Sequence, residues 1–280
     1  MMPLFIDQLG RRLELKQKPT RIISLVPSQT ELLFDLGIDE EVVGITKFCV
    51  HPEQWFRTKA RVGGTKQADL QKIRELQPDL IIANKEENEP GQIEELERDF
   101  PVWVSDVSNL RNALKMIKQI GMITGKNKSS EIYAEIKFAF DRLKTATRDF
   151  VAQRGVQGNA NEIRTAYLIW QEPYMSVGHD TFIHDMMKRC GLENIFAHRT
   201  RYPQATIDDL RDMETELVLL SSEPFPFKQK HVEELQRQLP ESRVMLADGE
   251  MFSWYGSRLR LAPQYFEDLQ RQVLSLTHAS

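Results

Sequence analysis

The chain alternates short, continuous apolar runs with segments whose apolar residues recur at helical spacing. The clearest apolar runs are RIISLV at 21–26, LIIAN at 80–84, TAYLIW at 165–170 and LVLLS at 217–221. Continuous runs of this length are typical of parallel strands that are buried on both faces. The pattern therefore predicts an α/β protein with mainly parallel sheets.

One long helical pattern divides the chain into two parts. Residues 127–153 contain neither proline nor glycine, which predicts a single uninterrupted helix. We expect an N-terminal lobe over residues 1–125, a rigid linking helix over residues 126–155 and a C-terminal lobe over residues 156–280. The expected fold class is thus α/β, with two α/β lobes of mainly parallel sheets bridged by one long helix.

The two lobes repeat one order of segments. In the first lobe, DLQKIRELQPDLIIAN runs into the loop KEENEPG and then into QIEELERDFPVWVSD. In the second, DLRDMETELVLLS runs into SEPFPFK and then into HVEELQRQLPESRVMLADGE. The shared order and the common EEL core favour duplication of one lobe, although the general likeness of α/β units is an alternative explanation.

Candidate ligand-binding positions follow from this organisation. The loops at 85–90 and 222–227 follow the carboxyl ends of predicted strands, where open α/β sheets bind ligands. We expect them on the two walls of a cleft between the lobes. Ser28-x-x-Glu31 predicts a capping box, so backbone N–H groups near Ser28 and Gln29 are expected to hold a polar ligand group.

Composition and charge narrow the function classes. The 280 residues are 41% apolar and 28% charged, as in an ordinary globular protein. A net charge of −4 without a basic stripe argues against nucleic acid as a partner. No apolar run approaches the ~20 residues of a transmembrane helix, and the N-terminus shows no signal peptide. We expect a monomer that is cytoplasmic if this N-terminus is native and exported if a signal was trimmed.

The segment TKFCVHPEQWFR at 46–57 places Cys49 two residues from His51. In an extended segment both side chains would share one face. Two soft ligands are too few for zinc, and a catalytic pair would need an oxyanion hole that no glycine-rich nest nearby supplies. A buried inert thiol and the lining of a pocket stay open. We expect no catalytic residue, no cofactor and no metal site of protein ligands alone, although His51 could ligate the metal of a bound chelate.

Aromatic residues gather in predicted loops and at predicted strand ends, which favours a surface that stacks against a large flat or apolar ligand. The aromatic candidates are Trp55, Trp170, Tyr174, Tyr202, Phe225, Phe227, Phe252, Trp254 and Tyr255. Basic candidates that would neutralise an anionic ligand are Lys85, Arg199, Arg201 and Arg258. Acidic candidates that would accept hydrogen bonds from amides on the ligand rim are Glu86, Glu87 and Glu223.

RIISLVPSQTELLFDLG, VVGITKF, DL-x-x-I-x-x-L-x-PDLIIA and CGLENIF, in this order, resemble the class III substrate-binding proteins. This family comprises helical-backbone receptors for cobalamin, iron–siderophores and haem. The resemblance covers residues 5–275 and implies two α/β lobes bridged by a rigid helix, delivery to an ABC permease, and a periplasmic or cell-surface location. It also places the loop after VVGITKF, with Phe48, Cys49 and His51, beside the ligand.

Members of this family usually present one surface carboxylate per lobe to arginines of the permease. The matching positions here are Gln71 and Asp208, so one charge is missing unless Asp69 takes its role. We predict a non-enzymatic binding protein of ABC-importer type for cobalamin or a related siderophore or haem chelate. The two acidic loops favour neutral, amide-rich cobalamin over strongly anionic ligands. Alternatives are a cytoplasmic corrinoid or chelate carrier or sensor on the same fold, a Cys/His enzyme, and a direct zinc or manganese receptor.

Overall fold

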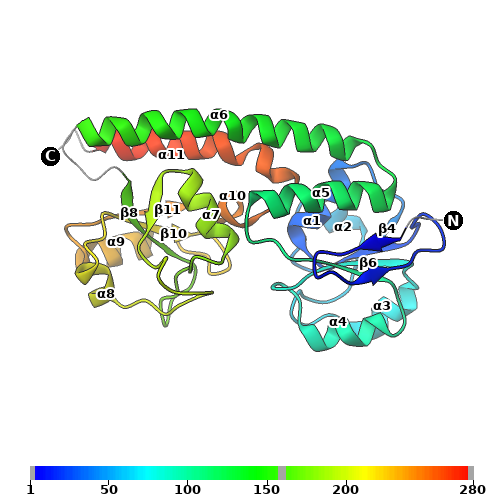
Figure 1. Cartoon of the computed structure of the whole chain (residues 1–280). Helices are drawn as coiled ribbons and strands as arrows, with labels where there is room; N and C mark the ends of the chain where they lie inside the picture. The colour runs from blue at the N-terminus through cyan, green and yellow to red at the C-terminus, as the bar shows by residue number, and fades with distance from the viewer. Residues whose placement is uncertain (1–3, 157–161, 277–280) are drawn as a thin grey trace. The chain divides into compact units, whose positions relative to one another are not determined.

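The computed structural model describes residues 4–156 and 162–276, which fall into two compact units (Figure 1). Unit 1 contains three described segments, namely the chain up to residue 107, residues 111–136 and residues 255–258. Unit 2 contains residues 108–110, residues 137–254 and the chain from residue 259 onward. The boundaries expected for two lobes and a separate linking helix stay a prediction.

Unit 1 is built on a five-stranded sheet in which every pairing is parallel. In sheet order its strands are β5 (Ala60–Arg61), β4 (Val42–Ile45), β3 (Ile22–Ser24), β6 (Leu80–Asn84) and β7 (Val102–Ser105). Its helices are α1 (Pro27–Asp35), α2 (Glu53–Thr58), α3 (Leu70–Leu76), α4 (Pro90–Glu97) and most of α5 (Leu110–Thr124). A short antiparallel hairpin, β1 (Phe5–Ile6) and β2 (Arg12–Leu13), precedes the sheet.

The sheet of unit 1 is covered on both faces. Helices α3 and α4 lie on one face and α1 and α5 on the other (Figure 1). On the first face, Ile73, Ile93 and Leu96 pack with Ile81 and Val104 of the strands. Covering both faces explains why these strands are apolar along their whole length in the sequence.

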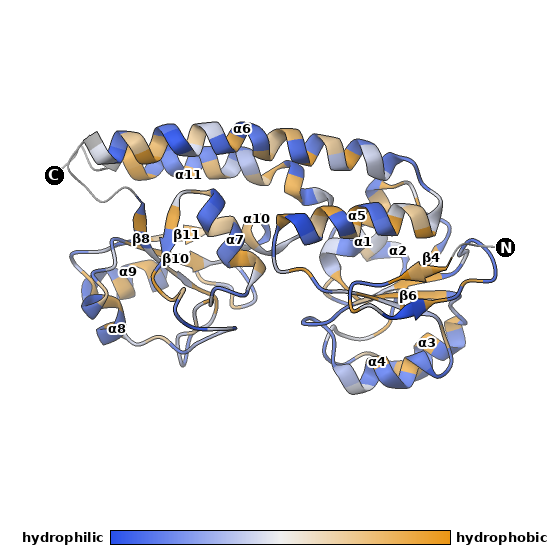
Figure 2. Cartoon of the chain, viewed as in Figure 1, coloured by the Kyte–Doolittle hydropathy of each residue, from blue (hydrophilic) through white to orange (hydrophobic). Residues whose placement is uncertain are grey.

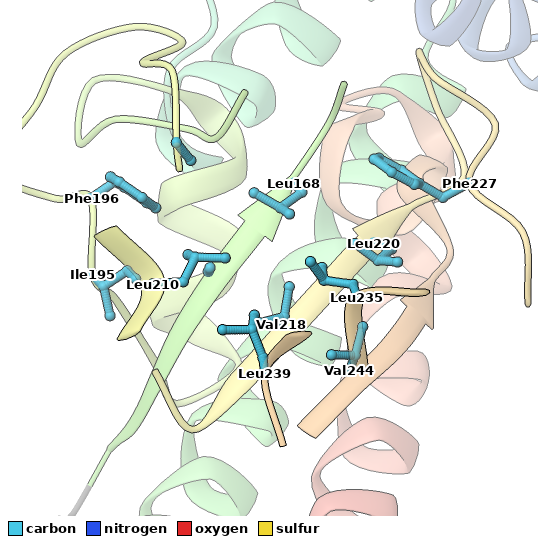
Figure 3. Packing of buried hydrophobic residues seen from close by; sticks show 12 residues of the cluster. Leu168, Ile195, Phe196, Leu210, Val218, Leu220, Phe227, Leu235, Leu239 and Val244 are labelled. Carbon is cyan, nitrogen blue, oxygen red and sulfur yellow. The ribbon is translucent and has the colours of Figure 1, made fainter. Parts of the chain in front are cut away.

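Unit 2 contains a four-stranded sheet, again entirely parallel. In sheet order its strands are β9 (Leu192–Asn194), β8 (Ile163–Leu168), β10 (Leu217–Ser221) and β11 (Arg243–Ala247). Its helices are α7 (Phe182–Arg189), α8 (Ile207–Asp212), α9 (Gln229–Gln238), α10 (Gly249–Ser253) and α11 (Ala262–Leu276), with the 3-10 turn η1 (Ser257–Arg260) beginning in unit 1. Figure 3 shows Leu168, Val218 and Leu220 of the strands beside Leu235 of α9 and Leu239, the residue that follows this helix.

The same strand order occurs in both sheets. Strands β4-β3-β6-β7 of unit 1 correspond to β9-β8-β10-β11 of unit 2, and β5 is an addition at one edge. The connecting helices also correspond, since α1, α3 and α4 take the places that α7, α8 and α9 take in unit 2. The repeated order of segments expected from the sequence is therefore present in the fold.

The long helix expected from the sequence is α6 (Lys128–Val156), with 29 residues. Its buried apolar residues Ile132, Ile136, Phe140, Leu143 and Phe150 are separated by three, four or seven positions. They therefore form one buried stripe along the helix. Figure 2 accordingly shows apolar positions along α6 interspersed with polar ones. The predicted fold class, two α/β halves with parallel sheets and one long helix, is confirmed.

The start of α1 differs from the prediction. The helix begins at Pro27, and its N-cap residue Val26 has no side-chain capping bond. Ser28 therefore lies in the first turn and forms no capping box. Proline suits this position because it has no N–H to leave unpaired and its φ is preset for a helix.

Candidate functional site

The carboxyl end of the unit 1 sheet is held by a buried asparagine. Asn84 closes β6, and its Nδ2 donates to Ser105 Oγ at 2.9 Å across to the end of β7. Its Oδ1 accepts from the backbone N–H groups of Glu86 at 2.8 Å and Glu87 at 3.1 Å. One side chain thus fixes the beginning of the 85–90 loop to the strand from which it departs.

A second asparagine closes the same loop. Asn88 Oδ1 accepts from the backbone N–H of Asn84 at 2.8 Å. Its Nδ2 donates to the carbonyl oxygens of Leu25 at 3.2 Å and Thr65 at 3.0 Å. Sequence reasoning missed this pair, although the NKEEN spacing, with an asparagine at each end of the loop, was a readable signal.

The acidic and basic residues in and around this loop make different contacts. Glu87 accepts from the Tyr255 hydroxyl. Lys85 pairs with Asp106 at 2.8 Å, with the lysine side chain 53% exposed. Lys66, which the sequence reasoning did not single out, donates to the carbonyl oxygens of Glu86 at 2.5 Å and Asn88 at 3.4 Å. The loop therefore keeps a basic side chain at its edge as well as its two glutamates.

The first turn of α1 is covered by residues 255–258, which belong to unit 1 although they come late in the chain. A Cβ on Gly256 would overlap the carbonyl oxygen of Ser28. Ser28 and Gln29 are 3% and 0% exposed, so neither offers a surface to a ligand. The prediction that this helix terminus holds a ligand group is therefore corrected.

The same segment contains two further candidates that make internal contacts. Arg258 forms a two-point pair with Glu31, with Nε–Oε2 and Nη2–Oε1 distances of 3.0 and 2.6 Å. Tyr255 is 6% exposed. Burial raises the pKa of Tyr255 well above its usual value, the charge of Glu87 adds to the rise, and a hydrogen bond with Ser28 opposes it. Both side chains stabilise unit 1, so the sequence-based role in stacking or charge neutralisation is corrected.

Cys49 is fully buried within a polar cluster. Thr30 Oγ1 lies 3.1 Å and Thr46 Oγ1 3.2 Å from its sulfur. Burial raises the pKa of the thiol, which the two hydroxyls offset only in part. Since the thiolate is the nucleophile and the metal ligand, this environment suits a structural thiol. The pocket-lining role expected for Cys49 is corrected, and His51, at intermediate exposure, stays a prediction.

The neighbours of Cys49 divide between surface and core. Phe48 is 52% exposed, and Lys47 Nζ lies 5.1 Å from the centre of its ring. Trp55 is instead 0% exposed in α2, where its indole donates to Asp39 Oδ1 at 2.7 Å and its ring meets Phe34 edge-on at 5.4 Å. The expectation that Trp55 lies in a loop and stacks on a ligand was wrong.

Unit 2 has an aromatic cluster at the carboxyl end of its sheet. Trp170 follows β8, is 42% exposed, and meets Phe225 edge-on at 5.7 Å between ring centres. Phe225 in turn contacts Phe227 at 4.7 Å and His231 at 5.5 Å. Phe227 is only 5% exposed and belongs to the core, which corrects its assignment, whereas Trp170 lies at the surface.

Two tyrosine candidates lie in the long connection from β8 to α7 and in the segment after β9. Tyr174 packs against the core cluster of unit 2, and burial raises the pKa of its hydroxyl. Tyr202 is 37% exposed, and the Arg201 guanidinium lies 5.6 Å from its ring centre. Arg199, the other basic candidate here, donates to the carbonyl of Gln204 at 3.0 Å. Tyr202 and Arg201 thus form an exposed aromatic and cationic pair like Phe48 and Lys47.

The surroundings of Glu223 shift the pKa of its carboxyl. It accepts hydrogen bonds from the Ser253 hydroxyl and from the Trp254 indole, the latter at 3.0 Å. Burial raises the pKa of Glu223, opposed first by the Ser253 bond and reinforced by the negative charge of Glu250. Trp254 is 6% exposed because this contact holds it inward, and Phe252 is 0% exposed in α10. The stacking role of both aromatics is therefore corrected.

The two carboxylates expected to dock on a permease have different local roles. Asp69 is the N-cap of α3 and accepts from the backbone N–H of Lys72 at 3.0 Å. Asp208 lies in the first turn of α8, where its side chain is 84% exposed and pairs with Arg211 at 3.1 Å. Gln71 donates to Glu75 Oε1 at 3.1 Å. Their role toward a permease stays a prediction.

Within each unit, the candidates that lie at the surface come from different loops, and these loops are neighbours. In unit 1, a Cβ built on Gly64 would lie 3.2 Å from the Phe48 ring, and the neighbouring Thr65 accepts from Asn88, so the Phe48 loop borders the 85–90 loop. In unit 2, Trp170 contacts Phe225 of the 222–227 loop. A shared cleft between the two loops stays a prediction.

Within residues 4–156 and 162–276, no group of three or more His, Cys, Asp or Glu side chains is placed to hold a metal ion. No described helix is long and apolar enough to cross a bilayer.

Comparison with known proteins gives consistent matches. A model of the periplasmic binding protein family matches residues 22–243. The vitamin B12-binding protein of Vibrio campbellii is 25% identical over 204 residues, covering 72% of this chain and 70% of that protein. An uncharacterised ABC transporter substrate-binding lipoprotein, YvrC of Bacillus subtilis, is 25% identical over 219 residues, which cover 74% of this chain and 65% of that protein.

Solved structures agree on the fold. The periplasmic vitamin B12-binding protein BtuF of Vibrio cholerae superposes with a TM-score of 0.74 at 19% identity, over 91% of this chain and 98% of that one. A periplasmic haem-binding protein of Pseudomonas aeruginosa gives a TM-score of 0.75 at 18% identity, over 90% and 92% of the two chains. At these identities the likeness is one of fold, and it spans proteins whose ligands differ.

Proposed function

Because the chain belongs to the periplasmic binding protein family, we propose that it is the substrate-binding protein of an ABC importer for a corrinoid or a related metal chelate. The observation that carries the choice of ligand class is the exposed aromatic side chain at the strand ends of each unit, Phe48 in unit 1 and Trp170 in unit 2. A large ligand with flat or apolar faces can cover such rings and gain both area burial and stacking. Relatives named for vitamin B12 support the same class.

The polar groups around these rings favour a ligand that carries hydrogen-bonding groups on its rim. Near Phe48, Lys47 and Lys66 offer donors, while Glu86 offers acceptor oxygens. Near Tyr202, Arg201 offers a further donor. A corrinoid with peripheral amides can use both kinds of group, whereas a strongly anionic chelate uses only the donors.

We further propose that the protein performs no chemistry on its ligand and works in the periplasm or at the cell surface. The absence of catalysis is supported by Cys49, whose sulfur is buried among threonine hydroxyls and whose pKa is raised by burial. The location is supported by relatives described as periplasmic or as a lipoprotein. A cytoplasmic carrier on the same fold is the competing proposal, and the gene sequence upstream of this chain distinguishes the two.

The test is a thermal-shift panel of cyanocobalamin, hydroxocobalamin, haemin, a ferric siderophore and divalent metal salts. A specific ligand must raise the melting temperature by mass action, so we expect stabilisation by one or both cobalamins. A further comparison concerns His51, because only hydroxocobalamin has an exchangeable axial water. A change in its visible spectrum that disappears in His51→Ala would assign axial ligation. Stabilisation by metal salts alone would contradict the proposal.

Affinity measurements on surface variants locate the binding loops. We expect Phe48→Ser and Trp170→Ser each to weaken corrinoid binding about 10-fold, because each removes roughly 1.5 kcal/mol of aromatic contact. Phe138→Ser is the matched control, since Phe138 is 66% exposed on α6 rather than at a strand end. Unchanged affinity in both loop variants, or an equal loss in Phe138→Ser, contradicts the assignment.

A further inference from the structure

The exposed ring of Phe48 belongs to a short turn that follows β4. Thr46, the residue after this strand, is 0% exposed, whereas Phe48 is 52% exposed. The backbone N–H of Cys49 donates to the carbonyl of Thr46 at 3.2 Å, and that of Val50 donates to the carbonyl of Phe48 at 2.9 Å. Backbone hydrogen bonds on both sides of Phe48 therefore close the turn that carries the ring.

The hydroxyl of Thr46 is the polar centre of this turn. Its Oγ1 accepts from the backbone N–H of Phe48 at 3.3 Å and lies 3.2 Å from Cys49 Sγ. Thr30 Oγ1, on α1, lies 3.1 Å from the same sulfur and bonds to the carbonyl of Val26 at 2.9 Å. Thr46 thus bonds directly to the residue that carries the ring, whereas Thr30 contacts this turn through the thiol.

The ring of Phe48 also lies against a second loop, at Gly64. The backbone N–H of Lys47 donates to the carbonyl of Gly63 at 2.8 Å, which joins the turn to this loop. A Cβ built on Gly64 would lie 3.2 Å from Cε2 of the Phe48 ring and 3.4 Å from Cε of Lys47. Carbon atoms ordinarily lie about 3.5–4.0 Å apart, so a side chain at Gly64 would press against the ring.

The two neighbouring glycines have different reasons to be glycine. Gly63 has a φ of +86°, and a Cβ there would lie 2.5 Å from the carbonyl oxygen of Gln67, so its backbone requires glycine. The φ of Gly64 is not positive, so the conformational reason does not apply to it. What a side chain at Gly64 would meet is Phe48 and Lys47. Glycine at this position therefore keeps the space that the ring occupies.

We propose that Thr46 and Gly64 are positioning residues that hold the ring of Phe48 in one pose, which the ligand covers without first ordering it. The inference rests on the proposed function, because Phe48 is one of the two rings assigned there to the ligand. Ordering a mobile side chain on binding weakens affinity. The Thr46 hydroxyl fixes the backbone of the turn, and Gly64 provides the space for the ring, so both act through Phe48.

The test measures cyanocobalamin affinity by calorimetry on the whole chain. Thr46→Val removes the hydroxyl at nearly constant shape, and Gly64→Ala adds the Cβ that presses on the ring. We expect each to weaken binding about 3- to 10-fold, which corresponds to the ordering of one side chain. Thr46→Ser keeps the hydroxyl and should restore affinity to within about 2-fold of the wild type. The melting temperature of Gly64→Ala should not fall, because alanine reduces the entropy of the unfolded chain.

A double-mutant cycle separates positioning from a general loosening of unit 1. In a Phe48→Ser background there is no ring to position, so Thr46→Val and Gly64→Ala should each change affinity by no more than about 2-fold. Thr30→Val, which removes the other hydroxyl beside Cys49, is the matched control and should bind within about 2-fold of the wild type. Equal weakening in the Phe48→Ser background, an equal loss in Thr30→Val, or unchanged affinity in both Thr46→Val and Gly64→Ala would overturn the proposal.

A measurement on the protein alone distinguishes this inference from the proposed function. We expect a nuclear Overhauser contact between the ring protons of Phe48 and the α-protons of Gly64, which weakens in Thr46→Val and is kept in Thr46→Ser. If this pattern occurs but cyanocobalamin does not bind, the proposed function fails and the fixed ring stands. If cyanocobalamin binds but the contact is absent, or is unchanged in Thr46→Val, the positioning fails and the proposed function stands.

Discussion

The two sheets share the order of four parallel strands, but their carboxyl ends differ in chemistry. In unit 1, β6 ends at Asn84, whose side chain is bonded to the next strand and to the following loop. In unit 2, the equivalent β10 ends at Ser221, which accepts from Tyr167 at 3.1 Å and donates to the carbonyl of Glu223 at 2.6 Å. The first end is closed by amide hydrogen bonds and the second by hydrogen bonds of hydroxyl groups.

This difference shows where a repeated fold is free to diverge. Strand residues are constrained by burial on both faces, so Leu80–Asn84 and Leu217–Ser221 remain alike in pattern. Loops are constrained mainly by the need to satisfy their own polar groups, which can be met in several ways. Unit 1 satisfies the polar groups of its loop with asparagine side chains, and unit 2 does so with hydroxyl groups and an indole. The aromatic ring exposed near the strand ends also differs, since it is Phe48 in unit 1 and Trp170 in unit 2.

The largest expected effect tests the amide closure. Asn84→Ala removes several buried hydrogen bonds and leaves the N–H groups of Glu86 and Glu87 without their acceptor. We expect a loss of about 3 kcal/mol in the free energy of unfolding. Ser221→Ala, its counterpart in unit 2, should cost about 1 kcal/mol. Hydrogen exchange resolved for peptides of β6 and β10 provides the measurement, and equal costs would contradict the distinction between the two ends.

A second comparison concerns an ion pair that occurs in unit 1. Arg258 and Glu31 are 12% and 18% exposed and are joined by two hydrogen bonds. Arg258→Met should cost about 2 kcal/mol, because the glutamate is left without its partner in a mostly buried site. Arg211→Met breaks the exposed pair with Asp208 and should change stability by no more than about 0.5 kcal/mol. Denaturant unfolding of both variants measures the difference, and a similar small cost for both would show that residues 255–258 are not held by this pair.

The sequence predicted the architecture more reliably than the candidate site. The apolar runs that became β3, β6, β8 and β10 and the proline-free run that became α6 carry strong periodic signals, because burial acts on every residue of such elements. The positions of Phe48 and Trp170 at the surface also agree with what their loops indicated. Whether these rings bind a ligand is a separate question that the measurements above address.

Three of the incorrect aromatic site residues share one physical cause. Trp55, Trp254 and Tyr255 were placed at the surface because they follow strands or lie in irregular sequence. Each one instead donates a hydrogen bond to a carboxylate, namely Asp39, Glu223 or Glu87. These partners lie far away in the chain for Trp254 and Tyr255, so no local pattern could reveal the contacts. An aromatic residue with a polar tip can be buried in a loop whenever such an acceptor is provided.

The smallest expected effect is a dependence of stability on pH from Glu223. Burial raises its pKa in the folded protein, so the folded state binds the proton more tightly than the unfolded chain does. Its contribution is therefore fully present below the ordinary glutamate pKa and is lost as pH rises through the raised value. Glu223→Gln cannot ionise and still offers an acceptor oxygen to Trp254, so its melting temperature relative to the wild type should be higher at pH 7.5 than at pH 4. Glu233→Gln, at an exposed position on α9, is the control. A difference that is the same at both pH values, or that reverses, would show that the Glu223 carboxyl is not held in a desolvated site.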